Sequence, residues 1–224
     1  PSDKLVYLES GNFFYEADDQ MPLTPLPVGK NNHISFGVCA DPVRINTQSV
    51  MCWAEILKKI PDSKLKFFHP VFPALICEQH LVAHFVGHDI DEERIEFHRA
   101  SDSYTRRFES FAAIDILLSP FPVTDDLQLI DALWMGCPVV ALAQGVRGAS
   151  RAGSLLTSAD QTKYLVHNED DYVDRAVAFA EDTNALAESR DNIRQEIRQS
   201  PLMNVKGSVS EWYATINALI STRT

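Results

Sequence analysis

Several signals are missing from this 224-residue sequence. No stretch approaches the ~20 consecutive apolar residues that cross a bilayer, and the opening segment has neither the basic nor the apolar region of a signal peptide. The 31 acidic residues outnumber the 20 basic ones, and no cluster of lysine and arginine stands out against the formal net charge of −11. We therefore expect a cytoplasmic protein, or a piece of one, that binds neither membrane nor nucleic acid.

Cysteine and histidine give no metal or redox signature. The four cysteines are widely spaced, with no CxxC pair, which indicates reduced and buried thiols. His80 and His84 would share one face of a predicted helix, but no Asp or Glu follows in metalloprotease register. We expect neither a metal site nor a bound cofactor.

Phosphate-binding glycine motifs and nucleophile motifs are also missing. No GxGxxG follows the first predicted strand, and the loop at residues 40–46 contains no glycine, which excludes a nucleotide-cofactor dehydrogenase. Acidic residues at strand ends are also found in phosphoacceptor receiver domains, but this fold class does not fit the sequence either. Because no Ser–His–Asp or Cys–His order stands out, the catalytic residues stay unknown.

The apolar content of 45% is sufficient for a core, in one large domain or two small ones. Short apolar runs alternate with segments of helical period, and this alternation predicts a Rossmann-like α/β fold with a parallel sheet flanked by helices. Strands are expected at residues 33–40, 65–69, 94–98, 114–118, 138–142 and 164–166. Helices are expected from Asn46 or Thr47 to Ile60 and at residues 73–87, 103–112, 126–135, 169–181, 185–199 and 208–220.

The sequence also suggests a division along the chain. Residues 1–32 contain Pro22, Pro25 and Pro27 and have no clear period, as is typical of a connecting segment. Residues 33–200 would form the Rossmann-like lobe, and residues 201–224 a C-terminal helix that closes it.

The segment LLSPFPVTDDLQLIDALWMGCPVV, residues 117–140, is the most informative part of the sequence. It predicts a strand, a loop, a helix that Gly136 closes before Pro138, and a further strand. Parallel sheets bind ligands at the carboxyl ends of their strands. The loops to inspect are therefore residues 40–46, 98–103, 119–125 and 143–150.

These residues resemble the C-terminal lobe of the O-linked N-acetylglucosamine transferase family, in particular bacterial members with tetratricopeptide repeats. The matching stretches follow the family order: ISFGVCADPVRIN, WAEILKKIPDSKL, GHDIDEERIEF, DILLSPFPVTDDLQLIDALWMGCPVV, ASRAGSLL and EDDYVDRAVAFAED. The resemblance implies the nucleotide-sugar lobe of a GT-B glycosyltransferase, with a UDP-sugar donor, a protein Ser or Thr acceptor and no metal. It also implies a missing N-terminal lobe.

The resemblance implies donor-site residues as well. Arg44 stands where the family has a lysine that meets the nucleotide phosphate, and an arginine can grip a diphosphate in a bidentate way. Asp131 matches an acidic residue that meets the ribose. Arg107, with Arg106 beside it, falls near a family histidine close to the uracil and phosphates.

The phosphate loop departs from the family pattern. Where the family has glycines and threonines, this sequence has TDDLQ, which keeps Thr124 and Gln128 as polar candidates but adds Asp125 and Asp126. At ~4 Å, each carboxylate would repel a phosphate by about 4 kcal/mol at an effective dielectric constant of about 20. Both aspartates are also favourable residues for starting a helix.

Three hypotheses follow. The first is the donor-binding lobe of a UDP-sugar-dependent protein O-glycosyltransferase, inactive as an isolated chain because the acceptor groups belong to the other lobe. The second is a catalytically degenerate relative that serves as a binding or protein-interaction module. The third is a glycosyltransferase with a differently charged donor.

Ser150 and Arg151 open the helix that follows the strand at residues 138–142, at the same edge of the sheet as the TDDLQ loop. We expect them to brace that loop.

Overall fold

The computed structural model describes residues 6, 8, 13–72, 74–100, 107–143 and 150–221, with only the backbone described at residue 107. Six strands form one sheet in the order β3-β2-β1-β4-β5-β6. Their bounds are β1 Ser35–Cys39, β2 Lys64–His69, β3 Ile95–Arg99, β4 Ile116–Leu118, β5 Val139–Leu142 and β6 Leu165–Val166. Every neighbouring pair is parallel, which confirms the predicted sheet type.

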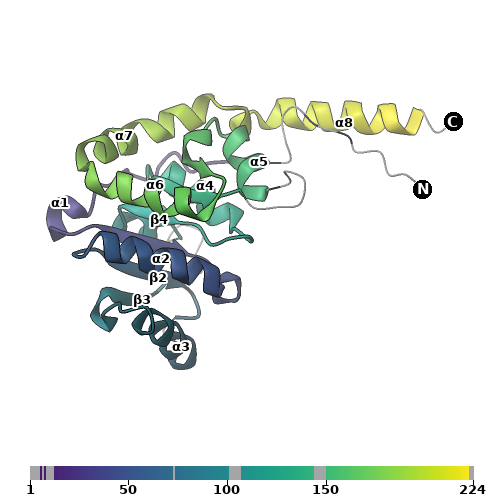
Figure 1. Ribbon diagram of the computed structural model, residues 1–224. Helices are drawn as coiled ribbons and strands as arrows, with labels where there is room; N and C mark the ends of the chain where they lie inside the picture. The colour runs from purple at the N-terminus through teal and green to yellow at the C-terminus, as the bar shows by residue number, and fades with distance from the viewer. Residues whose placement is uncertain are drawn as a thin grey trace.

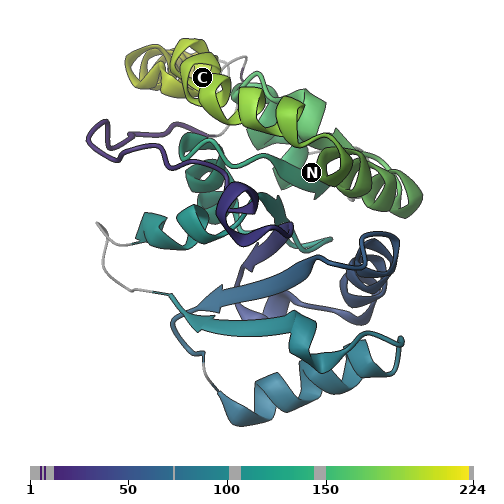
Figure 2. The ribbon, with the colours of Figure 1, turned by 90° about the vertical axis from the view of Figure 1, so that its left-hand side faces the viewer.

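Helices cover both faces of this sheet (Figure 1). The α-helices are α1 Val28–Asn31, α2 Thr47–Lys59, α3 Leu75–Val86, α4 Asp126–Trp134, α5 Arg151–Ser158, α6 Glu169–Glu181, α7 Thr183–Gln199 and α8 Val205–Ser221. Short 3-10 helices are η1 Pro42–Arg44, η2 Glu92–Arg94, η3 Arg107–Ala113, η5 Thr162–Tyr164 and η6 Pro201–Met203. In Figure 2, α3 in blue lies at the lower edge of the molecule and α7 in yellow-green at the upper edge.

The period of two along the strands divides the core between the two faces. Ile116 and Leu118 of β4 point to the side of α2, α3 and α6, where the largest buried side chain is Trp53. Leu117 between them points to the opposite side, with α4, α5 and most of α7, around Trp134. The central strand β4 is therefore covered by apolar side chains above and below, as parallel sheets require.

Short polar side chains start the helices. Asn46, Asp125, Ser150 and Asn168 each accept a hydrogen bond from the backbone N–H three residues on, at the starts of α2, α4, α5 and α6. These bonds satisfy backbone donors that have no partner within the helix. The predicted starts of α2 and α4 are thereby confirmed.

Gly136 ends α4 and turns the chain into β5. Its φ of +70° is a left-handed conformation that side chains other than glycine rarely adopt. A Cβ atom at this position would lie 2.3 Å from the carbonyl oxygen of Arg190 on α7. The predicted role of Gly136 is confirmed, and the structure adds a close helix–helix approach that the sequence did not indicate.

Several predicted elements have ends that are shifted by up to three residues, and two differences bear on the local structure. The strand expected at residues 94–98 lies one residue later, because Arg94 ends the 3-10 helix η2 and its guanidinium bonds to the backbone oxygens of Leu57, Ile60 and Ser63. The α-helix expected at residues 103–112 is, in its described part, the 3-10 helix η3. Residues 101–106 lie outside the described part of the chain.

Arginines of α7 fasten the N-terminal segment to the lobe. Arg190 is buried and donates to the backbone oxygen of Thr24 at 2.8 Å, and Arg194 donates to that of Met21 at 2.6 Å. The same two guanidiniums reach the backbone oxygens of Ile114 and Trp134. The N-terminal segment is therefore fastened to the lobe by partly buried bonds between arginine side chains and the backbone.

Candidate functional site

The strand order places a topological switch point between β1 and β4, where successive crossovers leave toward opposite faces. A hollow of about 180 Å³ opens there at the carboxyl ends of β1 and β2. Its lining includes Cys39, Ala40, Phe68, His69, Asp125 and Gln128. This is the edge at which the sequence predicted a ligand, and Gln128 is the predicted site residue that lines it directly.

Arg44 lies at the rim of this hollow, on the loop between β1 and α2. Its Nη1 atom donates to the backbone oxygen of Thr124 at 2.5 Å and lies 3.9 Å from Oδ2 of Asp125. The Arg44 side chain is 35% exposed, so an incoming anion could reach it. The structure thus brings together Arg44 and Thr124, two predicted site residues that lie far apart in the sequence.

Thr124 is buried and turned toward the interior of its loop. Its hydroxyl shares a hydrogen bond of 2.7 Å with the hydroxyl of Ser119, the residue that follows β4. A phosphate contact from Thr124 would have to compete with this bond. The phosphate role of Thr124 stays a prediction.

The two aspartates of the loop are paired with cations. Asp125 is the N-cap of α4 and faces Arg44, while Asp126, the first residue of α4, accepts a hydrogen bond of 2.7 Å from Nε of Arg151. This bond raises the pKa of Arg151. The structure thus confirms that both aspartates lie at a helix start and that Arg151 braces the loop.

Asp131 lies on the buried side of α4 and is fully inaccessible. Its Oδ1 atom accepts a hydrogen bond of 2.6 Å from the hydroxyl of Tyr15, which belongs to the N-terminal segment. Asp131 is not among the residues that line the hollow. A ribose contact would require the buried carboxylate to become accessible, and the role of Asp131 stays a prediction.

Arg107 begins η3, and its side chain lies outside the described part of the structure. Ser110, one turn later in the same 3-10 helix, lines the hollow. The segment that carries Arg107 is therefore at the expected edge of the sheet, and the predicted contact itself is untested.

A set of polar side chains that the sequence did not single out holds the loop after β4. Tyr172 of α6 donates to the backbone oxygen of Ser119 at 3.0 Å and accepts from Nε1 of Trp53 at 3.1 Å. Asn46 donates to the backbone oxygen of Phe121 at 2.6 Å. Asn46 was recognisable as a helix cap, but nothing in the sequence indicated its second bond.

Cys39 lies in the wall of the hollow without the properties of a nucleophile. Burial raises the pKa of its thiol well above the usual value, and the neighbouring Cys137, Asp125 and Asp131 raise it further. The thiol is therefore neutral at physiological pH. Within the ranges given above, no group of three or more His, Cys, Asp or Glu side chains is placed to hold a metal ion.

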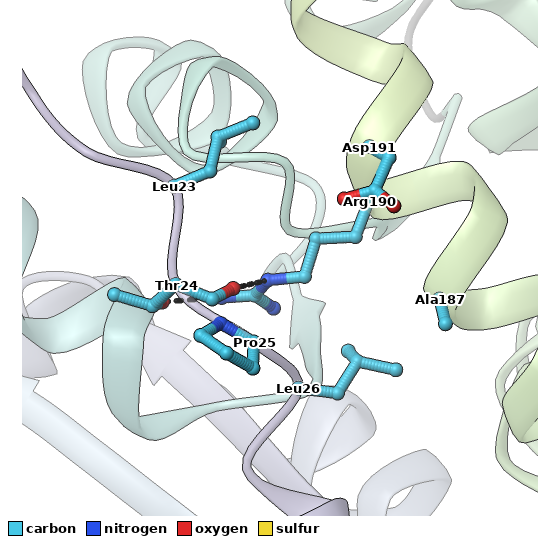
Figure 3. A pocket seen from close by; sticks show the side chains of 7 residues that line it. All are labelled: Leu23, Thr24, Pro25, Leu26, Ala187, Arg190 and Asp191. Atoms are coloured by element: carbon cyan, nitrogen blue, oxygen red, sulfur yellow. Dashed lines mark hydrogen bonds between the residues drawn. The ribbon is translucent and has the colours of Figure 1, made fainter.

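A second hollow, of about 380 Å³, lies at the opposite edge of the sheet, between residues 23–26 and α7 (Figure 3). Arg190 enters it, but its guanidinium donates to backbone oxygens of Thr24, Ile114 and Phe111. Ile114 precedes β4, so this hollow lies at the amino ends of the strands. Its arginine fastens the chain and is not available to a ligand.

Comparison with known proteins gives a consistent result. The family model for glycosyl transferase family 41 matches residues 30–212. A probable UDP-N-acetylglucosamine–peptide N-acetylglucosaminyltransferase, SPINDLY of Petunia hybrida, is 25% identical over 201 residues, which are 89% of this chain and 22% of that protein. Its counterpart in Hordeum vulgare is 26% identical over the same length, 89% of this chain and 21% of that protein.

Solved structures show the same fold. An O-GlcNAc transferase mutant of Thermobaculum terrenum superposes with a TM-score of 0.80 at 23% identity, over 92% of this chain and 39% of that one. A mutant of S. aureus TarM in complex with fondaparinux, alpha-GlcNAc-glycerol and UDP gives a TM-score of 0.60 at 12% identity, over 91% and 38% of the two chains. The chain thus spans only a minor part of each relative.

Proposed function

Because the chain belongs to glycosyl transferase family 41 and has the fold of one lobe of a GT-B glycosyltransferase, we propose that it is the donor-binding lobe of a UDP-sugar-dependent protein glycosyltransferase. The relatives are named as UDP-N-acetylglucosamine–peptide N-acetylglucosaminyltransferases. On this proposal the donor is a UDP-sugar, and the acceptor is a Ser or Thr hydroxyl of a protein.

The observation that carries the proposal is the charge arrangement at the switch point. The N-terminus of α4 offers backbone N–H groups and a partial positive charge at the rim of the hollow. Arg44 flanks it from the β1–α2 loop, and Arg151, at the start of α5, offsets the charge of Asp126. A diphosphate leaving group is held well by such a set of donors, without a metal ion.

The alternative of a degenerate binding module rests on Asp125 and Asp126. Each carboxylate has an arginine partner, so the loop presents compensated charges instead of two free anions. The repulsion of a phosphate is weaker than the sequence alone predicts, because Arg44 and Arg151 offset it. The family relationship also favours the donor-binding lobe over the module.

A second lobe is part of the proposal. One face of α8 exposes a stripe of apolar side chains, the α8 stripe, at helical spacing: Val209, Trp212, Tyr213, Ile216, Leu219 and Ile220. Phe14 joins four of them around an apolar hollow of about 290 Å³. Figure 1 shows α8 leading away from the body of the lobe.

An exposed apolar stripe of this length is typical of an interaction surface. Because the chain covers 39% of the solved Thermobaculum relative, we propose the remaining lobe of the parent protein as the partner of the α8 stripe. Groups that engage the acceptor would lie in that lobe, so the isolated chain is expected to bind UDP without turnover.

The cytoplasmic setting and the association with bacterial tetratricopeptide repeats stay predictions. Across the described ranges, no helix is long and apolar enough to cross a membrane.

Isothermal titration of UDP into the 224-residue chain tests the proposal. We expect saturable binding that Arg44→Ala weakens at least about tenfold, the value of one charge-assisted phosphate contact. Arg198→Ala is the matched control, because Arg198 also forms an exposed ion pair, with Asp19, but stacks on Trp134 at the other end of α4. Wild-type protein without any UDP binding, or equal effects of the two substitutions, would contradict the proposal.

A further inference from the structure

Asn46 uses both ends of its amide group, and each end serves a different loop. Its Oδ1 atom accepts from the backbone N–H of Ser49 at 2.8 Å and so caps α2. Its Nδ2 atom donates to the backbone oxygen of Phe121 at 2.6 Å. One side chain therefore joins the β1–α2 loop to the β4–α4 loop across the switch point.

Side chains of α2 and α6 also hold the loop after β4 in place. Ser49 exchanges hydrogen bonds of 3.3 Å with both the N–H and the carbonyl of Phe121, and the buried Phe121 ring packs edge-on against Tyr172 with centroids 5.2 Å apart. Tyr172 in turn fixes the carbonyl of Ser119, with Trp53 donating to its hydroxyl. The carbonyls of residues 119 and 121 are thus fixed by side chains from α2 and α6.

We infer that Asn46 is a positioning residue for the donor site and that Tyr172 supports the same loop from α6. The inference rests on the proposed function. Arg44 lies two residues before Asn46, and the N-cap of α4, Asp125, lies four residues after Phe121. Together with the two bonds from Ser49, the Asn46–Phe121 bond consequently sets the spacing between the cation and the helix N-terminus that would share the diphosphate.

The direct contact between the two loops cannot supply this spacing once a donor binds. Arg44 reaches the backbone oxygen of Thr124 through a guanidinium that is 35% exposed, and a phosphate would compete for the same donor atoms. The bond from Asn46 involves neither the guanidinium nor the N–H groups of α4. It can therefore persist in the occupied site, where fixed spacing keeps the cost of reorganisation low.

Asn46→Asp separates the two roles of this side chain. Aspartate caps a helix as well as asparagine does, but it has no N–H to donate to Phe121. In the full 224-residue chain we expect the melting temperature to change little and the dissociation constant of UDP to rise about tenfold, which corresponds to the loss of one partly buried hydrogen bond. Asn46→Ser, which also caps but is too short to reach Phe121, is expected to give the same rise.

Asn168→Asp is the matched control. Asn168 caps α6 in the same way, with Oδ1 accepting from the N–H of Asp171 at 2.8 Å and Nδ2 donating to the Asp171 carboxylate at 2.7 Å. It shares no bond with the loop after β4, so its substitution should leave UDP affinity unchanged. Equal shifts in UDP affinity for the Asn46 and Asn168 variants would overturn the inference.

Tyr172→Phe tests the same loop from α6, with Tyr164→Phe as its control. Both tyrosines are buried, but the hydroxyl of Tyr164 bonds to Ser189 on α7. We expect similar losses of melting temperature and a weakened UDP affinity for Tyr172→Phe alone. Wild-type protein that does not bind UDP contradicts the proposed function itself. Wild-type protein that binds, with Asn46→Asp, Asn46→Ser and Tyr172→Phe all within twofold of it, contradicts only the positioning role.

Discussion

Arg151 at the start of α5 donates from both Nε and Nη2 to the same carboxylate oxygen of Asp126, with the Nε contact at 2.7 Å. The ion pair ties the N-terminus of α4 to that of α5 and compensates one of the two acidic charges of this loop. It also occupies a guanidinium that could otherwise meet a phosphate. The pair therefore both steadies the loop and reduces its affinity for anions.

Replacing the two aspartates should strengthen UDP binding. In the double variant Asp125→Gly and Asp126→Asn, the carboxylates are gone while Arg44 and Arg151 remain, so we expect UDP affinity to rise about threefold to tenfold. Glycine at an N-cap costs only a few tenths of a kcal/mol relative to aspartate. Isothermal titration measures the effect, with Asp174→Asn, which removes an exposed partner of Lys59, as the control. Unchanged affinity in the double variant would show that repulsion is not what limits binding.

The sequence predicted the strand edge at which the hollow lies, because the strand, the prolines at positions 120 and 122 and the closing glycine are local signals. The sequence also predicted the parallel sheet, because apolar runs of strand length alternate with segments of helical period. The hydrogen bonds of Arg190 and Arg194 could not be predicted, because the sequence around a helical arginine does not indicate which distant backbone oxygen it will contact. The burial of Asp131 behind Tyr15 was unpredictable for the same reason, as the two residues are 116 positions apart.

Gly136 should be among the most sensitive positions of the fold. Alanine there would need a left-handed φ of +70° and would meet the carbonyl of Arg190, so we expect a loss of about 2 kcal/mol or more in the free energy of unfolding. Gly29→Ala is the control, because in the described part of the chain the added Cβ meets no atom within 4 Å apart from its chain neighbours and the backbone of its own helix. Urea denaturation of both variants gives the comparison. A loss for Gly136→Ala no greater than that for Gly29→Ala would contradict the close approach of α4 and α7.

The four thiols should differ in their reaction with a disulfide reagent. Cys77 on α3 is partly exposed, whereas Cys39, Cys52 and Cys137 are buried. Burial, with smaller contributions from nearby acidic groups, raises the pKa of Cys52 to about 11, and burial raises that of Cys137 to about 12. We expect one rapid modification, removed by Cys77→Ser, and three that require unfolding. Rapid labelling of Cys39 in the native protein would show that the hollow is wider than described.

Glu196 should give the fold a small dependence on pH. Hydrogen bonds from Lys163, at 2.6 Å, and from Gln161, at 2.9 Å, hold the pKa of Glu196 below its usual value. A depressed folded-state pKa stabilises the protein above the unfolded pKa of about 4.3, and the contribution is lost as pH falls through the folded value. Because the Glu196 side chain is 43% exposed, the effect is below about 1 kcal/mol.

Glu196→Gln should accordingly lower the free energy of unfolding near neutral pH and have little effect in acid. Glu188→Gln, an exposed position on the same helix, is the control. Urea titrations at about pH 7 and about pH 3 measure both. A cost of Glu196→Gln that is equal at the two pH values would contradict the role of its ionised form.

The proposed function requires UDP to bind at the switch point between β1 and β4. Mapping amide chemical shifts of the isotope-labelled chain during titration with UDP tests this binding site. We expect the largest changes on Asp126, Leu127 and Gln128 at the start of α4 and on the loop that carries Arg44. No changes, or changes confined to the hollow formed by residues 23–26 and Arg190, would contradict it.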